Sequence, residues 1–381
     1  MPIPELKHHI VFVSGQALPT LLGLFCFKPE PTHIHAVITP AMQEAAMLLK
    51  NMLKSRCQKC NFISYEIADN IRQESIYQVL DDIKAACPES SLGLNLTGGT
   101  KLMALAAWEW AYAHNIPAFY IDTAQDLIIH TGDKWQYEPL PDVLTVKDLL
   151  LANGFEIKAK QTGSVPEKRR QILVKLLKLA CTKEGEKALG RLNHLAKTCL
   201  PDLYIRDDSP PNDLWIQLIS ICEEAGMAKL EDGILSFPNE DCRRWCNGAW
   251  IEEYIQMTLY RLKHDQKIKD WAINVQVDSQ NEVPNELDAL FCIRNRLFIV
   301  ESKTSTMMGS INQSDKVPSY LYKADSLHDR LGGIYAKAML CSVRRLKNKD
   351  LNRAQNMGVK VIFGKDILNL YDIIVDWIKT A

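Results

Sequence analysis

The sequence predicts an α/β protein with more than one domain. Its 381 residues exceed one typical core, and a prior of about 150 residues per domain suggests two or three domains. In roughly the first 150 residues, short apolar runs alternate with helical patterns, which predicts a doubly wound sheet of parallel strands with helices on both faces. Towards the C-terminus, a helix, a strand, a hairpin and a further helix predict a compact second α/β domain.

The expected parallel strands are short apolar runs, and the residues that follow them are candidates for ligand binding. We expect strands at residues 10–13, 34–38, 62–66, 92–96 and 118–122, and helices at residues 41–55, 75–86 and 102–114. Ligands of such sheets bind at the carboxyl ends of the strands. The candidates there are Ser14, Gly15, Gln16, Thr39, Pro40, Asn95, Thr97, Gly98, Gly99, Thr100 and Lys101.

A short polar segment at residues 161–166 marks a boundary. Beyond it, we expect helices at residues 167–181 and 212–225 and a hairpin at residues 227–238 that turns at Asp232 and Gly233. Helices followed by a hairpin predict a small winged-helix-like segment at residues 165–240. Such a segment binds DNA, acts as a rigid spacer or serves as a dimerisation element, and we favour the spacer because it has no arginine-rich helix.

The C-terminal domain is predicted to begin with a helix. Ile251, Ile255, Leu259 and Leu262 keep helical spacing. Alternating apolar residues then predict a strand at residues 271–277, and two further strands at residues 286–293 and 297–303 flank a turn at residues 294–296.

Composition excludes several classes of protein. Hydrophobic residues make up 47% and charged residues 24%, as in an ordinary soluble globular protein. Lys plus Arg, 45 residues, nearly balances Asp plus Glu, 46 residues, so any nucleic-acid surface must be local. The apolar runs are shorter than the ~20 residues that span a bilayer, so we expect no membrane segment.

The cysteines indicate a reducing compartment. There are 11, an odd number, spread along the chain without a secretory signal, so we expect reduced thiols in the cytoplasm. Cys57 and Cys60 have the spacing of half a zinc site, but no second pair completes it. We therefore interpret them as ordinary thiols.

The most specific pattern predicts a metal-dependent nuclease. Glu301 and Lys303 lie two apart on one strand and share a face, whereas Ser302 points away. Asp288 lies across the predicted hairpin, and Asp288, Glu301 and the Ser302 carbonyl would supply oxygen ligands for Mg²⁺ or Mn²⁺. Lys303 would orient or activate a water, and Glu252, on the preceding helix, would bind a second ion or stiffen the first site. The alternative is a Glu/Lys pair that merely closes a hairpin.

These residues resemble the PD-(D/E)XK nuclease superfamily. Asp288 matches its first acidic position, Glu301 to Lys303 match the (D/E)XK element, and Glu252 matches its helical glutamate. The resemblance implies a restriction-endonuclease-like α/β fold for residues 241–381.

The glycine turn after the fourth strand predicts an anion site. Gly98 and Gly99 would let backbone amides approach an anion, Thr97 and Thr100 add hydroxyls, and Lys101 adds charge beside a helix N-terminus. The turn lacks the spacing of a dinucleotide site or a P-loop.

Together with residues 13–16, this turn resembles the Rossmann-like CARF domain, here residues 1–155. A CARF domain joined to a PD-(D/E)XK domain is similar to the nuclease effectors of type III CRISPR defence. The resemblance implies a homodimer that binds a cyclic oligoadenylate, most often cyclic tetra-adenylate, and then cleaves DNA, RNA or both.

Two other functions stay open. The chain could be a ligand-responsive transcription regulator with an inert C-terminal domain, or a ring nuclease that degrades cyclic oligoadenylate. For substrate contact we propose the basic stretch at residues 344–349, with Arg344, Arg345 and Lys347, and the helix at residues 320–331, followed by Gly332 and Gly333.

Overall fold

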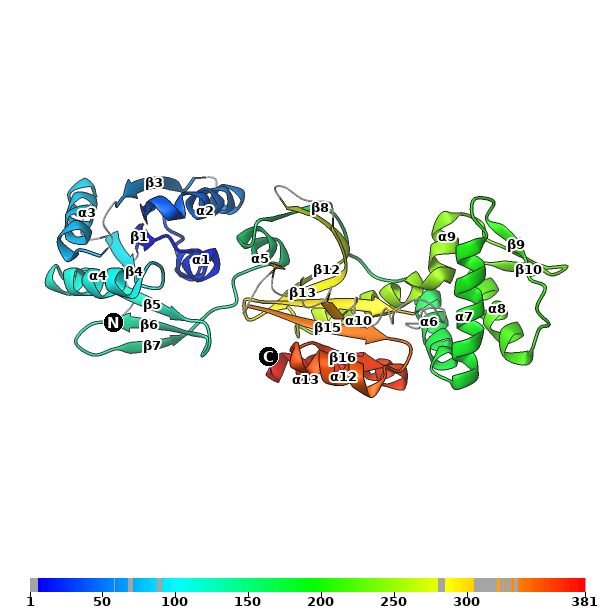
Figure 1. The fold of residues 1–381 in the computed structure, drawn as a ribbon. Helices are drawn as coiled ribbons and strands as arrows, with labels where there is room; N and C mark the ends of the chain where they lie inside the picture. The colour runs from blue at the N-terminus through cyan, green and yellow to red at the C-terminus, as the bar shows by residue number, and fades with distance from the viewer. Residues whose placement is uncertain are drawn as a thin grey trace. The chain divides into compact units, whose positions relative to one another are not determined.

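The chain forms two compact units, Met1–Glu156 and Ile157–Ala381 (Figure 1). The computed structural model describes residues 6–57, 59–67, 71–87, 91–279, 285–304, 321–322, 326, 330–331 and 335–380. Among these residues, no helix is long and apolar enough to cross a membrane.

The first unit is built on a seven-stranded sheet in the order β3-β2-β1-β4-β5-β6-β7. The first five strands are parallel and confirm the five predicted ones, whereas β6 and β7 add an antiparallel hairpin that was not predicted. The strands are β1 (His8–Phe12), β2 (His33–Ile38), β3 (Asn61–Glu66), β4 (Leu92–Asn95), β5 (Ala118–Asp122), β6 (Leu127–Thr131) and β7 (Gln136–Pro139).

The strand order reverses between β1 and β4, because the chain builds β2 and β3 on one side of β1 and then returns to its other side. At such a switch point, the loops that leave the two strands diverge and open a crevice at their carboxyl ends. The loops after β1 and β4 carry most of the candidate ligand-binding residues, and Thr39 and Pro40 follow β2.

Helices cover both faces of this sheet. The helices α3 and α4 pack together on one face, and α1, α2 and α5 contact one another on the other (Figure 1). The predicted α2, α3 and α4 are confirmed. The helices are α1 (Ala17–Phe25), η1 (Pro40–Met42), α2 (Gln43–Arg56), α3 (Gln73–Ala86), α4 (Lys101–Ala113) and α5 (Val146–Ala152).

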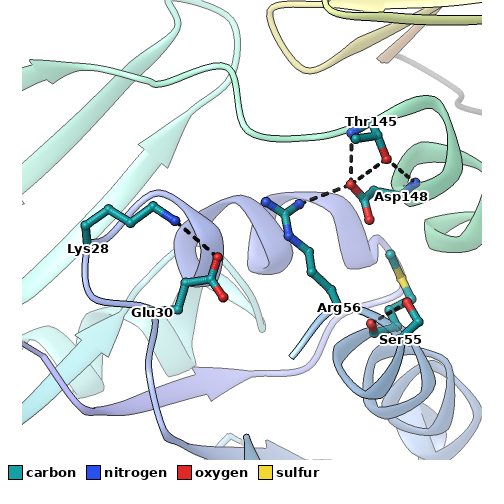
Figure 2. Close-up of polar contacts among 7 residues, drawn as sticks. Lys28, Glu30, Ser55, Arg56, Thr145 and Asp148 are labelled. Carbon is teal, nitrogen blue, oxygen red and sulfur yellow. Dashed lines mark hydrogen bonds and ion pairs between the residues drawn. The ribbon is translucent and has the colours of Figure 1, made fainter. Parts of the chain in front are cut away.

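The last helix of the unit is fixed to α2 by a partly buried ion pair. Arg56 donates to Asp148 Oδ2 over 3.1 Å, and the same carboxylate oxygen accepts from the Thr145 backbone and hydroxyl (Figure 2). Thr145 in turn caps the first turn of α5. Removing the Asp148 carboxylate would therefore break a helix cap and would also leave the Arg56 guanidinium without its ion-pair partner.

The second unit begins with helices and a small sheet. The predicted α6, α8 and hairpin are confirmed, and Asp232 and Gly233 both adopt positive φ, as a two-residue hairpin turn requires. The elements are β8 (Phe155–Gln161), which starts at the unit boundary, α6 (Glu167–Ala180), α7 (Lys183–Thr198), β9 (Tyr204–Arg206), α8 (Asp213–Glu224), β10 (Lys229–Glu231) and β11 (Ile234–Ser236).

A six-stranded sheet in the order β16-β15-β14-β13-β12-β8 completes this unit. The predicted helix α10 and strands β12 to β14 are confirmed, with Arg294 and Asn295 at positive φ in the turn. The elements are α9 (Glu240–Arg244), η3 (Trp245–Ala249), α10 (Trp250–His264), β12 (Asp270–Ser279), β13 (Asn285–Ile293), β14 (Arg296–Lys303), β15 (Ala336–Ser342), α12 (Asn348–Asn356), β16 (Lys360–Phe363), η5 (Gly364–Asn369) and α13 (Leu370–Thr380).

One large apolar core is shared by the helices and the six-stranded sheet of the second unit. Leu176 of α6 and Trp215 of α8 belong to the same buried cluster as Ile255 of α10 and Phe298 of β14. The helices of residues 167–224 thus share a core with the sheet that carries the acidic residues, and α6 packs against α10.

Candidate functional site

The candidate nuclease site lies where β13 and β14 separate. The antiparallel pairing of these two strands ends at Ala289 and Val300, one position before Asp288 and Glu301. The backbone N–H of Ser302 donates to Asp288 Oδ2 over 2.7 Å, so the carboxylate takes the place of a strand carbonyl. The expectation that Ser302 points away is wrong, because its hydroxyl also lies 3.0 Å from Asp288 Oδ2.

Asp288, Glu301 and Lys303 meet as expected from strand alternation. The Lys303 ammonium lies 3.7 Å from Asp288 Oδ2 and 3.8 Å from Glu301 Oε2. The Glu301 side chain is only 2% exposed, so its negative charge requires compensation. Lys303 supplies part of that compensation.

Glu252 faces the same acidic residues from the first turn of α10. Burial, followed by the negative charges of Asp288 and Glu286, raises the pKa of Glu252 to about 8. This helix can approach β14 because residue 248 is glycine: a Cβ there would lie 2.0 Å from Thr304 Oγ1. Gly248 also has a φ of 127°.

The donor set fits a hard divalent cation. It consists of carboxylate oxygens, with the Ser302 carbonyl at the end of the same strand. The carboxylates of Glu252, Asp288 and Glu301 do not all lie within 4.8 Å of one another among the described residues. The Lys303 ammonium instead lies within ion-pair distance of both Asp288 and Glu301.

A cleft of about 480 Å³ opens beside these residues, lined by Glu252, Ser302 and Lys303. Lys197 at the end of α7 and Arg244 at the end of α9 line it as well, both exposed and without a hydrogen bond or ion pair to another described residue. Sequence reasoning missed these two cations. The adjacent arginines Arg243 and Arg244, at the end of α9, were the signal in the sequence that could have indicated Arg244.

The neighbouring Arg243 also lines the cleft but is engaged within the fold. Its guanidinium donates to the Ala196 carbonyl over 2.6 Å and pairs with Glu240 at 2.6 Å.

The basic stretch proposed for substrate contact has a different role at its first residue. Arg344 donates to the Glu186 carbonyl over 3.1 Å and lies 3.7 Å from the Glu186 carboxylate. It therefore attaches to α7, while Arg345 and Lys347 are exposed. Most of the helix expected at residues 320–331, with Gly332 and Gly333, lies outside the described residues.

In the first unit, the glycine turn after β4 packs tightly against β1. A Cβ on Gly98 would lie 2.0 Å from the Phe12 carbonyl, and Gly99 has a φ of +78°. Both positions require glycine for this close approach. Close packing explains why both residues are glycine. Access of an anion to the backbone, which the sequence predicted as the reason, is not needed for that explanation.

Several polar side chains of this turn that were candidates for ligand binding form hydrogen bonds within the protein. Asn95 is 1% exposed and accepts from the Thr97 backbone over 2.9 Å. The Thr97 hydroxyl accepts from the Ile121 backbone over 2.9 Å, and the Thr100 hydroxyl caps α4 by accepting from Met103 over 3.2 Å. These three side chains shape the loop.

The remaining candidates at this edge are accessible. Gly15, Gln16, Pro40 and Lys101 are exposed, and Ser14 and Thr39 are half-buried. Ser14 donates to the Gln16 carbonyl over 3.0 Å and so folds the loop after β1. Lys101 has no hydrogen bond or ion pair to another described residue.

Comparison with known families assigns the two ends of the chain. Residues 8–149 match the Card1 CARF domain, and residues 239–381 match the Card1-like endonuclease domain. The chain therefore combines a CARF domain of the Card1 type with a Card1-like endonuclease domain. A comparison with curated proteins gives no match.

Two solved structures resemble this CARF endonuclease over nearly its full length. Protein VC1899 from Vibrio cholerae is 26% identical with a TM-score of 0.82, and the match covers 98% of each chain. Can2 from Sulfobacillus thermosulfidooxidans, in complex with cyclic tetra-adenylate, is 25% identical with a TM-score of 0.80, covering 97% of this chain and 99% of Can2.

A third structure shares the fold alone. It is a type III CRISPR defence DNA nuclease activated by cyclic oligoadenylate, 15% identical with a TM-score of 0.56, and the match covers 97% of this chain and 52% of that one.

Proposed function

We propose that this protein is a cytoplasmic, homodimeric nuclease of type III CRISPR defence that cleaves DNA, RNA or both when cyclic tetra-adenylate binds its CARF domain. The observation that carries the proposal is the convergence of Asp288, Glu301 and Lys303 beside a cleft with unpaired cations. The resemblance to Can2 in complex with cyclic tetra-adenylate supports the choice of activator.

Asp288, Glu301 and the Ser302 carbonyl would hold Mn²⁺ or Mg²⁺, with Glu252 as a further carboxylate on the opposite side. When bound, the ion would polarise the scissile phosphate and acidify a water. Ser302 keeps Asp288 in place through its N–H and hydroxyl, so this ligand is oriented before binding.

Lys303 would act on the reacting groups once a cation satisfies the two carboxylates. Its ammonium then no longer has to compensate Asp288 and Glu301, and it can hold the attacking water or the phosphate oxygen on which charge develops. Glu252 is protonated at neutral pH before binding, since its pKa is about 8. It would lose that proton on joining the site.

Lys197 and Arg244 would hold the phosphates that flank the scissile bond. They reach the cleft from α7 and α9, and neither forms a hydrogen bond or ion pair with a described residue. Phosphate contacts of this kind give affinity without sequence preference.

In the CARF domain, Lys101 and the loops after β1 and β2 would contact the cyclic oligoadenylate. Beside Lys101, α4 exposes Leu102 by 53% and Leu105 by 64%. Exposed apolar side chains next to a ligand loop favour a two-fold interface, across which a symmetric ligand can contact both protomers alike.

Plasmid and single-stranded DNA and RNA, incubated with Mn²⁺ with and without cyclic tetra-adenylate, test the proposal directly. We expect cleavage that requires both additions and is lost in Asp288→Asn. Binding of DNA without cleavage would favour the regulator instead. Loss of cyclic tetra-adenylate without added metal would favour the ring nuclease.

A further inference from the structure

The amino end of the sheet in the first unit carries a cluster of imidazole and thiol groups. β1 and β2 pair in the register His8 to His33, so His8, His33 and His35 project from the same face. Helix α3 covers this face, and Cys87 directly follows its last residue. The cluster lies at the opposite end of the strands from the candidate oligoadenylate loops.

Three atoms that can bind a metal converge in this cluster. His8 Nδ1 and His35 Nε2 are 3.1 Å apart, and with Cys87 Sγ they form a group whose ligand atoms all lie within 4.8 Å of one another. His35 and Cys87 are buried, whereas His8 is half-buried, so the group borders solvent at His8.

The geometry suits a tetrahedral ion. Two nitrogens bound at about 2.0–2.1 Å to one zinc ion lie about 3.3 Å apart at the tetrahedral angle, close to the observed 3.1 Å. The other ring nitrogen of His35 lies 3.2 Å from the Tyr65 hydroxyl. Such an outer contact fixes the ring of a metal-bound histidine.

We propose that His8, His35 and Cys87 bind one zinc ion, with the fourth position open to water. On binding, the Cys87 thiol releases its proton to solvent and gives up its 2.9 Å contact with the Ile83 carbonyl. The proton of the hydrogen bond between His8 and His35 moves to the other nitrogen of the ring that carries it, and no oxidation or reduction takes place. Nitrogen and sulfur ligands select zinc over the Mg²⁺ and Mn²⁺ that suit carboxylates. The ion would join the end of α3 to β1 and β2.

The test is cobalt and zinc binding to the full-length, metal-stripped protein in the Glu301→Ala background, which removes a proposed ligand of the nuclease site. We expect one equivalent of Co²⁺ with thiolate-to-cobalt absorption in the near ultraviolet, displaced by zinc. Cys87→Ser should abolish that absorption and His8→Ala should weaken binding. Cys57→Ser, which replaces a half-buried thiol of this unit outside the cluster, is the control and should behave as the parent.

A milder variant separates metal binding from folding. Tyr65→Phe keeps the ring and all three ligands, and should lower zinc affinity by about 10- to 100-fold, as loss of an outer-shell contact does. Circular dichroism of each metal-free variant reports whether it folds. Absence of thiolate absorption in the folded parent, or its persistence in folded Cys87→Ser, would overturn the site and leave a hydrogen-bonded histidine pair.

Discussion

Glu252→Gln should stabilise the metal-free protein at high pH. The folded pKa of Glu252, about 8, exceeds its ordinary value of 4.5, so the folded state holds a proton that the unfolded state has released. The free energy of unfolding therefore falls as pH rises from about 4.5 to about 8 and is then constant with respect to this group. Glutamine mimics the protonated side chain and removes this penalty.

The size of the effect follows from the two pKa values. A difference of about 3.5, at about 1.4 kcal/mol for each pKa unit, sets an upper bound of about 5 kcal/mol. Because water and side-chain rotation accommodate a buried carboxylate, we expect about 2–3 kcal/mol at pH 9. At pH 5, where the folded carboxyl is already neutral, the variant should differ by less than about 1 kcal/mol.

Urea unfolding at pH 5 and pH 9 in a chelating buffer measures the difference. Glu184→Gln, an exposed glutamate in the first turn of α7 without an ion pair to a described residue, is the control and should show no comparable gain. Excess Mn²⁺ should reduce the difference in unfolding free energy between Glu252→Gln and the wild type, because it stabilises the wild type preferentially. An equal effect of Glu252→Gln at both pH values would refute the reasoning.

Three further predictions concern catalysis and binding. Glu301→Ala or Lys303→Ala should abolish cleavage yet leave the affinity for cyclic tetra-adenylate unchanged in calorimetry, and wild-type cleavage in either variant would exclude that residue from catalysis. Lys101→Ala should weaken the binding of cyclic tetra-adenylate by about 1.5–3 kcal/mol and raise the activator concentration needed for cleavage; unchanged calorimetry would place the pocket elsewhere. Replacing Lys197 and Arg244 by alanine should lower substrate affinity and reduce the slope of log affinity against log salt by about 2, whereas a wild-type slope would remove them from the substrate path.

Strand periodicity was enough to predict that Asp288, Glu301 and Lys303 lie together. Glu301 and Lys303 share a face because successive side chains alternate, and the short turn at residues 294–296 fixes which residue of β13 faces them. The sequence could not predict that Ser302 also contacts Asp288, because this depends on the separation of two strands that alternation treats as regular.

Other misses arise from contacts between distant residues. Thr97 is held by Ile121, 24 residues away, and Arg344 by Glu186, 158 residues away, so neither side chain is available as the local sequence suggested. Helix α1 was missed for another reason. All nine of its residues are buried, so it has no polar face from which a helical period can be recognised.

The shared core of residues 157–381 has a consequence for how this protein can be divided. A fragment that starts at residue 239, where the endonuclease family match begins, would leave α10 without α6, which packs against it. Leucine and tryptophan side chains of the shared core would become exposed to solvent and would favour aggregation. The cleft would also lose Lys197. Recombination that exchanges the endonuclease domain between such effectors must therefore transfer residues 157–381 as one segment.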